Sequence, residues 1–435
     1  MPIEMNETYV AERPLAGFAA DTGVCMLAAG LAKRLEPISS IIAKPAFPLG
    51  GQTPIIELWV RTFVDAGLSR IAMNLHRVPE SIRGHFGDGS RFLADITYVD
   101  ERIPSGTLGG AIKMVRALHE KGFHPRRVFI PSGDIVSTID SRHLRAMLDL
   151  HTRHGAAVTM MLAPIPWDRR GDFGTTVLDG IAAGQPVPPN TYARITEFRE
   201  KDPTSPSNEN NASNYLIETS FLLELEPYLT AAQADIADPC YDFGKHMFPA
   251  MKGKVPHLGF LTRYADHLFG YEPGALWFDV GNKRDYLDVN AAVLNRTLQL
   301  PVAYHEHPWG WMGERVEIDF SRVVIRAPVV IGHGCTIRPG AEIGPNAVLG
   351  DGWTCHKGAR VKDAVLWKHY EREGSASGGP ELNAVREVRE NVVIDSAIVV
   401  RGAIAQDVSG QTVDSLPDGT LDIRSLDWVP GGARA

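Results

Sequence analysis

Two basic side chains near the start of the chain follow a short apolar run and a turn of small residues. The run ends at Leu27, and the small residues Ala29 and Gly30 come after it. The cations Arg34 and Lys44 follow, and a proline stands directly after Lys44. A buried strand that leads into such a turn can bring backbone N–H groups close to phosphate oxygens, and fixed cations neutralise the phosphate charge. The pattern therefore predicts a phosphate-binding turn, although its spacing is neither that of a P-loop nor that of a dinucleotide fingerprint.

Two aspartates each end an apolar strand close to a glycine. Asp134 directly follows a glycine, and Asp279 stands two residues before one. A carboxylate in such a place can hold Mg²⁺, which prefers oxygen ligands and needs few contacts from the protein. Asp134 could instead cap the helix that is expected from residue 141, but Asp140 suits that role better. Asp279 could merely end its strand in a turn. The pattern therefore predicts metal binding at Asp134, and for each of the two aspartates it leaves the structural alternative open.

The elements that would position these residues alternate between strand and helix. Apolar runs predict strands at residues 24–27, 71–75, 96–99, 128–130 and 158–162. Amphipathic segments predict helices at residues 54–66, 79–86, 109–121 and 141–154. This alternation predicts an α/β fold in which helices cover both faces of a mainly parallel sheet. Ligands of such folds bind beyond the carboxyl ends of the strands, where the turn after Leu27 would lie.

A glycine-rich turn at residues 105–110 precedes the third of these helices. Its glycines would let a planar or phosphorylated ligand approach the backbone closely. A turn of this composition could also serve only as the start of a helix. Its place in the chain, after the phosphate-binding turn, favours ligand binding.

From Val323 onward, aliphatic residues recur every six positions. Ile331, Ile337 and Ile343 belong to one series, and the smaller Cys335 stands two positions before Ile337. A six-residue repeat of this kind is typical of a parallel β-helix, in which each turn of the chain stacks on the one before.

These patterns divide the chain into four parts. We expect an N-terminal extension at residues 1–22, an α/β domain at 23–295, a linker at 296–322 and a β-helix at 323–425, with an inserted charged loop at 367–391. Two further turns of the β-helix are expected at Ile394 and Val400, with Ile398 and Ile404 in step. Stacks of this kind often mediate assembly, so we expect a homo-oligomer that forms through the β-helix.

Composition excludes several classes of protein. The chain has 435 residues, of which 44% are hydrophobic and 22% charged, values typical of a globular protein with two or three domains. Its net charge of −8 argues against a nucleic-acid-binding surface. The four cysteines form no CxxC pair, which fits a reduced, cytoplasmic setting without a zinc site or disulfide framework. Neither a signal peptide nor a membrane span is expected, because the chain lacks a basic and apolar leader and any run of about 18 apolar residues.

Taken in order, the motifs resemble those of the sugar-1-phosphate nucleotidyltransferases. Residues 30–34 (GLAKR), with Lys44 and its proline, are similar to the family's Gly-x-Gly-x-Arg and Lys-Pro signature. The turn at 105–110 is similar to its Leu-Gly-Thr-Ala-Gly segment, and residues 277–281 (WFDVG) are similar to its Trp-x-Asp-Ile-Gly. The resemblance implies a Rossmann-like three-layer domain followed by a left-handed parallel β-helix.

The resemblance also implies a reaction, in which an NTP and a sugar 1-phosphate give an NDP-sugar and pyrophosphate with Mg²⁺ as cofactor. Arg34 and Lys44 would be the catalytic cations, and Asp134 and Asp279 would hold Mg²⁺. The nucleotide-binding residues would be Leu27, Ala29, Gly30, Gly106, Thr107 and Gly109. The residues that bind the sugar phosphate would be Gly174, Glu200 and Lys201.

Two sets of substrates stay open within this family. The runs at 74–76 (NLH) and 86–90 (FGDGS) are most similar to mannose-1-phosphate guanylyltransferases, which implies GDP-mannose as the product. Residues 43–46 (AKPA), with the glycines at 50 and 51, are similar to glucose-1-phosphate adenylyltransferases. Glucose 1-phosphate with ATP, UTP or dTTP is therefore the alternative.

Three departures from the family pattern motivate a second hypothesis. Ala32 stands where the family has glycine, and an alanine is strained if the turn needs a positive φ. Asp202 is inserted in the segment similar to Glu-Lys-Pro, and the glycine expected after Asn214 is missing. These changes suggest a regulatory subunit that binds nucleotide sugars without making them. An acyltransferase site at His333 or His356 of the β-helix is a third, weaker hypothesis, because histidines at solvated corners explain both residues.

Overall fold

The computed structural model describes residues 16–36, 38–181, 191–227, 240–251, 257–261, 277–300, 302–367, 387–388, 393–400, 403–406, 411–415 and 421–425. The chain divides into two compact units, each made of two stretches of sequence. Unit 1 comprises Met1–Leu31 and Ile56–Trp277, and unit 2 comprises Ala32–Ile55 and Phe278–Ala435. The segment that carries Arg34 and Lys44 therefore belongs to the same unit as Asp279 and the C-terminal strands.

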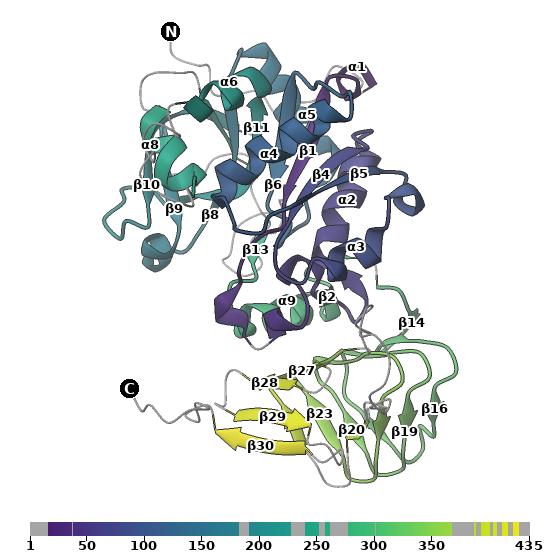
Figure 1. The fold of residues 1–435 in the computed structure, drawn as a ribbon. Helices are drawn as coiled ribbons and strands as arrows, with labels where there is room; N and C mark the ends of the chain where they lie inside the picture. Colours follow the sequence, from purple (N-terminus) through teal and green to yellow (C-terminus); the bar gives the residue numbers. More distant parts are fainter. Residues whose placement is uncertain are drawn as a thin grey trace. The chain divides into compact units, whose positions relative to one another are not determined.

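Unit 1 is built on a nine-stranded sheet (Figure 1). Its strands, in spatial order, are β5 (Asp95–Asp100), β4 (Arg70–Leu75), β1 (Thr22–Leu27), β6 (Arg127–Pro131), β11 (Glu209–Glu218), β8 (Val158–Pro164), β12 (His257–Leu261), β10 (Thr191–Glu200) and β9 (Gly174–Leu178). The five predicted strands β1, β4, β5, β6 and β8 are confirmed. The first four run parallel as neighbours. The sheet as a whole is mixed, because β11 runs antiparallel between β6 and β8.

Helices cover both faces of this sheet, and each of the four predicted helices is present. They are α2 (Ile55–Asp65), α3 (Glu80–Phe86), α4 (Gly106–Glu120) and α5 (Ser141–Arg153). Side chains alternate between the two faces along a strand, so Phe129 of β6 packs on Phe63 of α2, with ring centroids 5.5 Å apart. Its neighbour Ile130 packs with Leu108 of α4 in a core cluster on the other face. The result is the expected three-layer arrangement.

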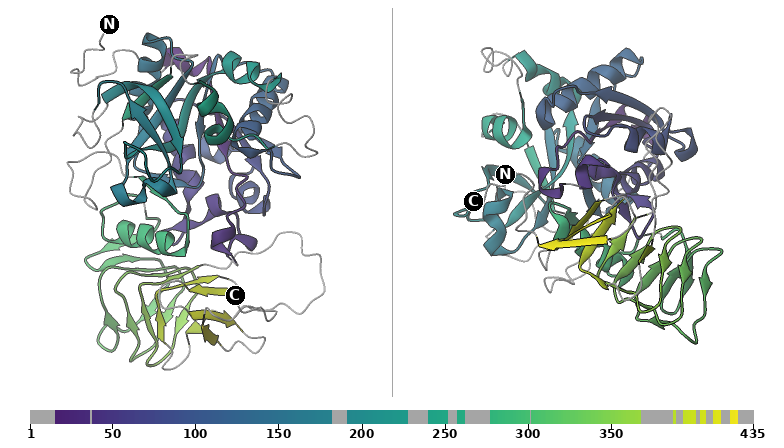
Figure 2. Two further views of the ribbon diagram at one scale, coloured as in Figure 1. Left: turned by 90° about the vertical axis from the view of Figure 1, so that its left-hand side faces the viewer. Right: turned by 60° about the horizontal axis from the view of Figure 1, so that its bottom comes forward.

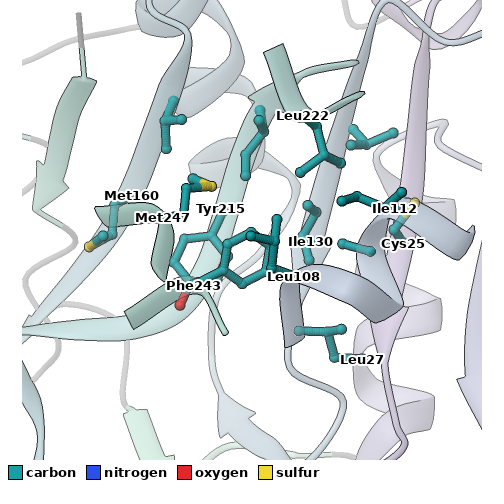
Figure 3. Close-up of a cluster of buried hydrophobic side chains, with 14 of the residues drawn as sticks. Cys25, Leu27, Leu108, Ile112, Ile130, Met160, Tyr215, Leu222, Phe243 and Met247 are labelled. Carbon is teal, nitrogen blue, oxygen red and sulfur yellow. The ribbon is translucent and has the colours of Figure 1, made fainter. Parts of the chain in front are cut away.

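That second face carries a large core cluster, part of which is drawn in Figure 3. Cys25 of β1 lies in it beside Ile112 of α4, and Leu27 of β1 belongs to the same cluster. Tyr215 and Phe243 extend the cluster with ring centroids 4.9 Å apart. Burying an aliphatic or aromatic side chain of this size contributes about 1.5–3 kcal/mol. The cluster therefore holds β1 and the start of α4 firmly, and both lead into predicted ligand-binding turns.

Unit 2 contains three parallel sheets of short strands, which are the faces of a parallel β-helix (Figure 1). One sheet has as its parallel part β15 (Gly310–Met312), β18 (Val329–Ile331), β21 (Ala347–Leu349), β24 (Val365–Leu366) and β27 (Ala397–Val400), and antiparallel strands extend it at both ends. The second consists of β16 (Glu317–Ile318), β19 (Thr336–Ile337), β22 (Thr354–Cys355) and β25 (Glu387–Val388). The third consists of β17 (Val324–Ile325), β20 (Glu342–Ile343), β23 (Arg360–Lys362) and β26 (Val393–Asp395). Ile331, Ile337 and Ile343 of the six-residue series, with Cys335, are buried in the common interior.

The β-helix differs from its predicted extent at both ends. Its first coil begins at Gly310, inside the stretch 296–322 that the sequence assigns to a linker, because β15 already pairs in parallel with β18. At the other end, β27 is followed by the antiparallel strands β28 (Ala403–Gln406), β29 (Gln411–Ser415) and β30 (Leu421–Ser425), which are yellow in Figure 2. Ile404 pairs antiparallel with Val399 and so does not open a further parallel turn. Most of the predicted loop 367–391 lies outside the described residues.

Unit 2 also contains short elements from the segment with the two cations. These are the 3₁₀ turns η1 (Lys33–Leu35), η2 (Ile38–Ser40) and η3 (Lys44–Ala46), and the strand pair β2 (Pro48–Leu49) and β3 (Thr53–Pro54). The helix α9 (Lys283–Leu294) follows Asp279 and packs with β2. In the part of the chain that is described, no helix is both long and apolar enough to cross a membrane.

Candidate functional site

The turn after β1 is held by backbone hydrogen bonds at its start and is exposed at its end. The carbonyl oxygen of Leu27 accepts a hydrogen bond of 2.8 Å from the N–H of Gly133. The N–H of Ala28 donates to Oδ1 of Asn74 at 2.8 Å. Gly30 is exposed, and a Cβ atom placed on it would have no atom within 4 Å. The predicted phosphate-binding turn is therefore fixed at Ala28 and open at Gly30.

Asp134 lies beside this turn, at the carboxyl end of β6. The Gly133 bond to Leu27 joins the two segments, and a Cβ on Gly133 would crowd that same carbonyl oxygen at 3.1 Å. The hydroxyl of Ser132 donates to Oδ1 of Asp134 at 2.7 Å, which orients the half-buried carboxylate. Asp140 caps α5, with its side chain accepting from the N–H groups of Arg142 and His143. Asp134 therefore does not serve as that cap, in agreement with the sequence prediction.

The glycine-rich turn before α4 has a protein neighbour where a ligand was expected. Gly106 has a φ of +81°, and a Cβ placed on it would clash with the backbone of Tyr241. The carbonyl oxygen of Tyr241 accepts from the N–H groups of Leu108 (2.8 Å) and Gly109 (3.2 Å). The N–H of Thr107 donates to the carboxylate of Asp242 at 3.3 Å. These amides bond within the protein, so the nucleotide-binding role of Gly106, Thr107 and Gly109 stays a prediction that would have to use other groups of this segment.

A buried polar network joins the two predicted nucleotide-binding turns, and the sequence analysis did not find it. Asn74, at the end of β4, accepts from Ala28 and donates to Glu101 Oε1 at 2.6 Å. Glu101 also accepts from the N–H of Ser105 (2.9 Å) and from Lys113 (3.0 Å). Burial raises the pKa of Glu101, but the bonds from Ser105 and Asn74 outweigh it and bring the pKa below its usual range. The only signal in the sequence is an asparagine inside an apolar strand.

The predicted sugar-phosphate residues lie where β9 and β10 pair. Gly174 stands opposite Glu200 in the ladder, and a Cβ on Gly174 would lie 2.8 Å from Glu200 Oε2. A Cβ on Gly244 would lie 2.6 Å from the same oxygen. Two glycines therefore make room for this carboxylate. Lys201 follows with an exposed side chain and a φ of +51°. The structure thus brings Gly174, Glu200 and Lys201 together.

Two buried asparagines of β11 have polar atoms without a hydrogen-bond partner among the described residues. They are Nδ2 and Oδ1 of Asn210 and Oδ1 of Asn214. Asn214 pairs in register with Pro131, directly before the segment that carries Asp134. A buried polar group without a partner costs about 1–3 kcal/mol, so such groups point to a bound water or ligand.

In unit 2, three predicted residues come together around Gly281. Nζ of Lys44 lies 3.1 Å from Oδ1 of Asp279, and the lysine is buried. A Cβ placed on Gly281 would lie 3.1 Å from a terminal nitrogen of Arg34 and 3.3 Å from Oδ2 of Asp279. The turn is fixed because the N–H of Gly281 donates to Asp285 at 3.1 Å. The structure therefore places both predicted catalytic cations beside the second predicted metal ligand, and the roles of all three residues stay predictions.

Ala32 has the left-handed backbone that the sequence analysis anticipated. Its φ is 47° and its ψ is 39°. Glycine adopts this conformation without steric cost, whereas an alanine pays about 1–2 kcal/mol. The alanine therefore introduces strain two residues before Arg34.

Asp134 belongs to unit 1 and Asp279 to unit 2, so their sharing of one metal ion stays a prediction. The described residues contain no group of three or more histidine, cysteine, aspartate or glutamate side chains that could hold a metal ion. Mg²⁺ is usually held by one or two carboxylates together with substrate phosphates. Two aspartates at strand ends, with hard oxygen donors, fit that requirement.

The comparisons with known proteins agree on one family. Residues 24–296 match the family model described as nucleotidyl transferase. The UTP–glucose-1-phosphate uridylyltransferase of Synechocystis is 26% identical over 420 residues, which cover 94% of this chain and 93% of that protein. The glucose-1-phosphate adenylyltransferase of Bacillus cytotoxicus is 25% identical over 88% of this chain and 92% of its own length. The mannose-1-phosphate guanylyltransferase of Mycobacterium tuberculosis is 26% identical over 78% and 80%.

One solved structure that matches part of the chain is described as a glucose-1-phosphate thymidylyltransferase of Bacillus anthracis in complex with a sucrose. It is 18% identical, with a TM-score of 0.48, and the match covers 64% of this chain and 97% of that one.

Proposed function

Because the chain belongs to the nucleotidyl transferase family, as a sugar-1-phosphate nucleotidyltransferase, we propose that it joins an NTP to a hexose 1-phosphate and releases pyrophosphate. An oxygen of the sugar phosphate attacks the α-phosphorus of the NTP. The bond from that phosphorus to the bridging oxygen of the β-phosphate breaks, and pyrophosphate leaves with the electron pair. A phosphate oxygen is already anionic, so the step needs positioning and charge stabilisation more than a general base.

The observation that carries the proposal is the cluster of Arg34, Lys44 and Asp279. Lys44 pairs with Asp279, and Arg34 lies at the same Gly281 turn. Lys44 is buried and therefore poorly screened by water. In the reaction, Arg34 stabilises the charge on the triphosphate and on the departing pyrophosphate. Lys44 binds phosphate oxygens beside it. Asp279 holds the ammonium of Lys44 in place when no nucleotide is bound.

We also propose Mg²⁺ as the cofactor of the reaction. Asp134 and Asp279 would hold it, and when bound it would neutralise part of the charge of the nucleotide phosphates. Leu27, Ala29 and Gly30 form the turn that receives the nucleotide, and the open space beside Gly30 supports this role.

The sugar phosphate binds on the side of unit 1 that carries Gly174, Glu200 and Lys201. Glu200 is an acceptor for sugar hydroxyls, and the exposed ammonium of Lys201 pairs with the phosphate. The buried amide atoms of Asn210 and Asn214 that lack partners support a polar ligand near this region.

Two sugar 1-phosphates are candidates, each with its own nucleotides. The sequence predicts GTP with mannose 1-phosphate. Glucose 1-phosphate with UTP or ATP is the second candidate, because a relative that matches nearly the whole chain is named for UTP and glucose 1-phosphate. A matrix of five NTPs against mannose, glucose and N-acetylglucosamine 1-phosphates, read by pyrophosphate release, decides between them. The pair with the highest kcat/KM is the substrate pair.

A regulatory subunit is the alternative to an enzyme, and the strained Ala32 motivates it. It predicts no pyrophosphate release with any pair but measurable binding of a nucleotide sugar by calorimetry. We also propose that the protein assembles as a homo-oligomer through the β-helix. Sedimentation of the full chain beside a chain shortened before Gly310 tests this, because only the full chain should sediment as an oligomer.

A further inference from the structure

We propose that the β-helix positions Lys44, through contacts of its residues Trp367 and Asp351 with the segment 47–52. This inference rests on the catalytic role proposed for Lys44. All of the residues involved belong to unit 2. Trp367 and Asp351 are positioning residues in this account, because they act on Lys44 through the backbone and do not touch a substrate.

The first contact is aromatic. Phe47, three residues after Lys44, is fully buried, and its ring lies edge-on against Trp367 (5.1 Å between centroids) and Tyr286 (5.4 Å). Nε1 of Trp367 donates to the hydroxyl of Tyr286 at 2.9 Å. That hydroxyl in turn donates to the carbonyl oxygen of Pro48. A chain of two hydrogen bonds therefore connects the indole of the β-helix to the backbone next to Phe47.

Trp367 is itself fixed by the β-helix. It directly follows β24, and its N–H donates to the carbonyl oxygen of Val399 in the next coil at 2.8 Å. Its own carbonyl oxygen accepts from Nε1 of Trp353 at 2.9 Å. Two neighbouring coils of the β-helix therefore fix Trp367, and the indole of Trp367 in turn packs against the ring of Phe47.

The second contact is polar and lies at the far end of the segment. Asp351, in the turn after β21, accepts from Nε2 of Gln52 at 3.1 Å. It also accepts from Tyr304 (3.0 Å) and from the N–H of His333 (2.8 Å), which fixes the carboxylate. The adjacent Gly51 has a φ of +95°, and a Cβ on it would lie 3.3 Å from a side-chain carbon of Val348. The segment is therefore held against the β-helix at both ends.

The sheet of the β-helix that packs against segment 47–52 has an apolar, buried outer face. Val330, Val348, Val365 and Ile398 follow one another in register across this sheet and are all buried. They alternate with residues such as Ile331 and Leu349 that fill the interior. The corresponding outer positions of another sheet include Glu342 and Arg360. The buried apolar outer face is the surface against which segment 47–52 and α9 pack.

Amide hydrogen exchange on the full-length protein tests the proposal without any substrate. Trp367→Ala removes both the ring and the indole N–H. Tyr286→Phe keeps the ring and removes the hydroxyl that bridges to Pro48. Trp309→Ala is the matched control, because Trp309 packs on the same β-helix core while its described ring partners are His307 and Phe320.

In Trp367→Ala, peptides that span residues 44–55 should exchange on the order of tenfold faster, while peptides of unit 1 stay unchanged. Tyr286→Phe should give a smaller increase in the same peptides. Where the product assay shows activity, kcat should fall by about tenfold in Trp367→Ala, with little change in the KM for the sugar phosphate. Trp309→Ala should lower the melting temperature without faster exchange in residues 44–55.

Unchanged exchange of residues 44–55 in Trp367→Ala and Tyr286→Phe overturns the proposal, as does an equal increase in Trp309→Ala. If Trp367→Ala does not fold, Tyr286→Phe alone decides, since it changes one atom. Faster exchange together with an inactive wild-type protein would leave the positioning intact and count against the proposed function instead.

Discussion

Nζ of Lys44 lies 3.1 Å from Oδ1 of Asp279, although 235 positions separate the two residues in the chain. The contact unites a cation of the N-terminal turn with a carboxylate that the sequence predicts as a metal ligand. Since Lys44 is buried, the pair is weakly screened, and a change in either partner should alter the charge at the reacting phosphates. It is the basis of the first prediction.

Replacing Lys44 with methionine should lower kcat by on the order of a hundredfold or more, because it removes a preorganised positive charge from the transferring phosphates. Steady-state kinetics with the best substrate pair measures the effect. Lys362→Met is the matched control, since Lys362 also pairs with an aspartate (Asp395, 2.8 Å) but on an exposed surface. An equal loss in both variants would show that Lys44 has no special role.

Replacing Ala32 with glycine should stabilise the protein by about 1 kcal/mol, because glycine adopts the left-handed conformation without strain. Ala43→Gly, at a φ of −62°, should instead destabilise it, since glycine there adds freedom to the unfolded chain and removes a buried methyl group. Urea unfolding of both variants measures the difference. A loss of stability in Ala32→Gly would contradict this explanation of the strained turn.

Replacement by alanine should reduce stability at Gly106 but not at Gly30. Gly106→Ala should lower the free energy of unfolding by about 2 kcal/mol or more, because the new Cβ clashes with the Tyr241 backbone at a positive φ. Gly30→Ala should leave stability nearly unchanged, since no atom lies within 4 Å of the new Cβ. It should still weaken NTP binding, measured by calorimetry, if the nucleotide approaches that turn. Normal NTP affinity in Gly30→Ala would argue against a phosphate contact there.

Replacing Asn74 with alanine should raise the KM for the NTP more than the KM for the sugar phosphate. The variant leaves the N–H of Ala28 without a partner and removes one of the donors to the buried Glu101, so the two turns on the nucleotide side lose the side chain that connects them. Two-substrate kinetics measures the split. Asn295→Ala, at an exposed helix end, serves as the control. Equal rises of both KM values would indicate a general structural effect.

The free energy of unfolding should depend on pH through Glu218. Burial raises the pKa of Glu218, but bonds from His151 and Arg126 outweigh it and lower the pKa from 4.5 to about 2. The folded state therefore binds its proton less readily than the unfolded state. This contribution to stability is fully present above pH 4.5 and is lost as the pH falls towards 2. Urea unfolding from pH 6 to pH 3 should show a shallower decline in Glu218→Gln than in the wild type, and parallel declines would contradict this.

Much of unit 1 could be predicted because local patterns agree with the tertiary fold. The helix expected at 141–154 is α5, and its cap is the expected Asp140. The antiparallel β11 could not be predicted, since its place between β6 and β8 depends on distant strands. Likewise, nothing local to Gly106 reveals that the backbone of Tyr241 lies against it.

The β-helix shows a second limit of the sequence pattern. The six-residue spacing did not reveal its first coil. Ile318 pairs with Ile337, and their separation in the chain is one residue longer than the separation between Ile337 and its partner Cys355. At the other end, Ile404 keeps the period but pairs antiparallel. A spacing of aliphatic residues alone does not distinguish a further coil from a hairpin.

Phosphorus NMR of the wild-type protein with Mg²⁺, each NTP and each hexose 1-phosphate tests the central claim most directly. The account predicts that one pair gives the paired diphosphate resonances of an NDP-sugar together with free pyrophosphate, and that Asp279→Asn and Lys44→Met each suppress both products. Binding of a nucleotide sugar with no such product from any pair would contradict it, and would identify the chain as a subunit that senses nucleotide sugars.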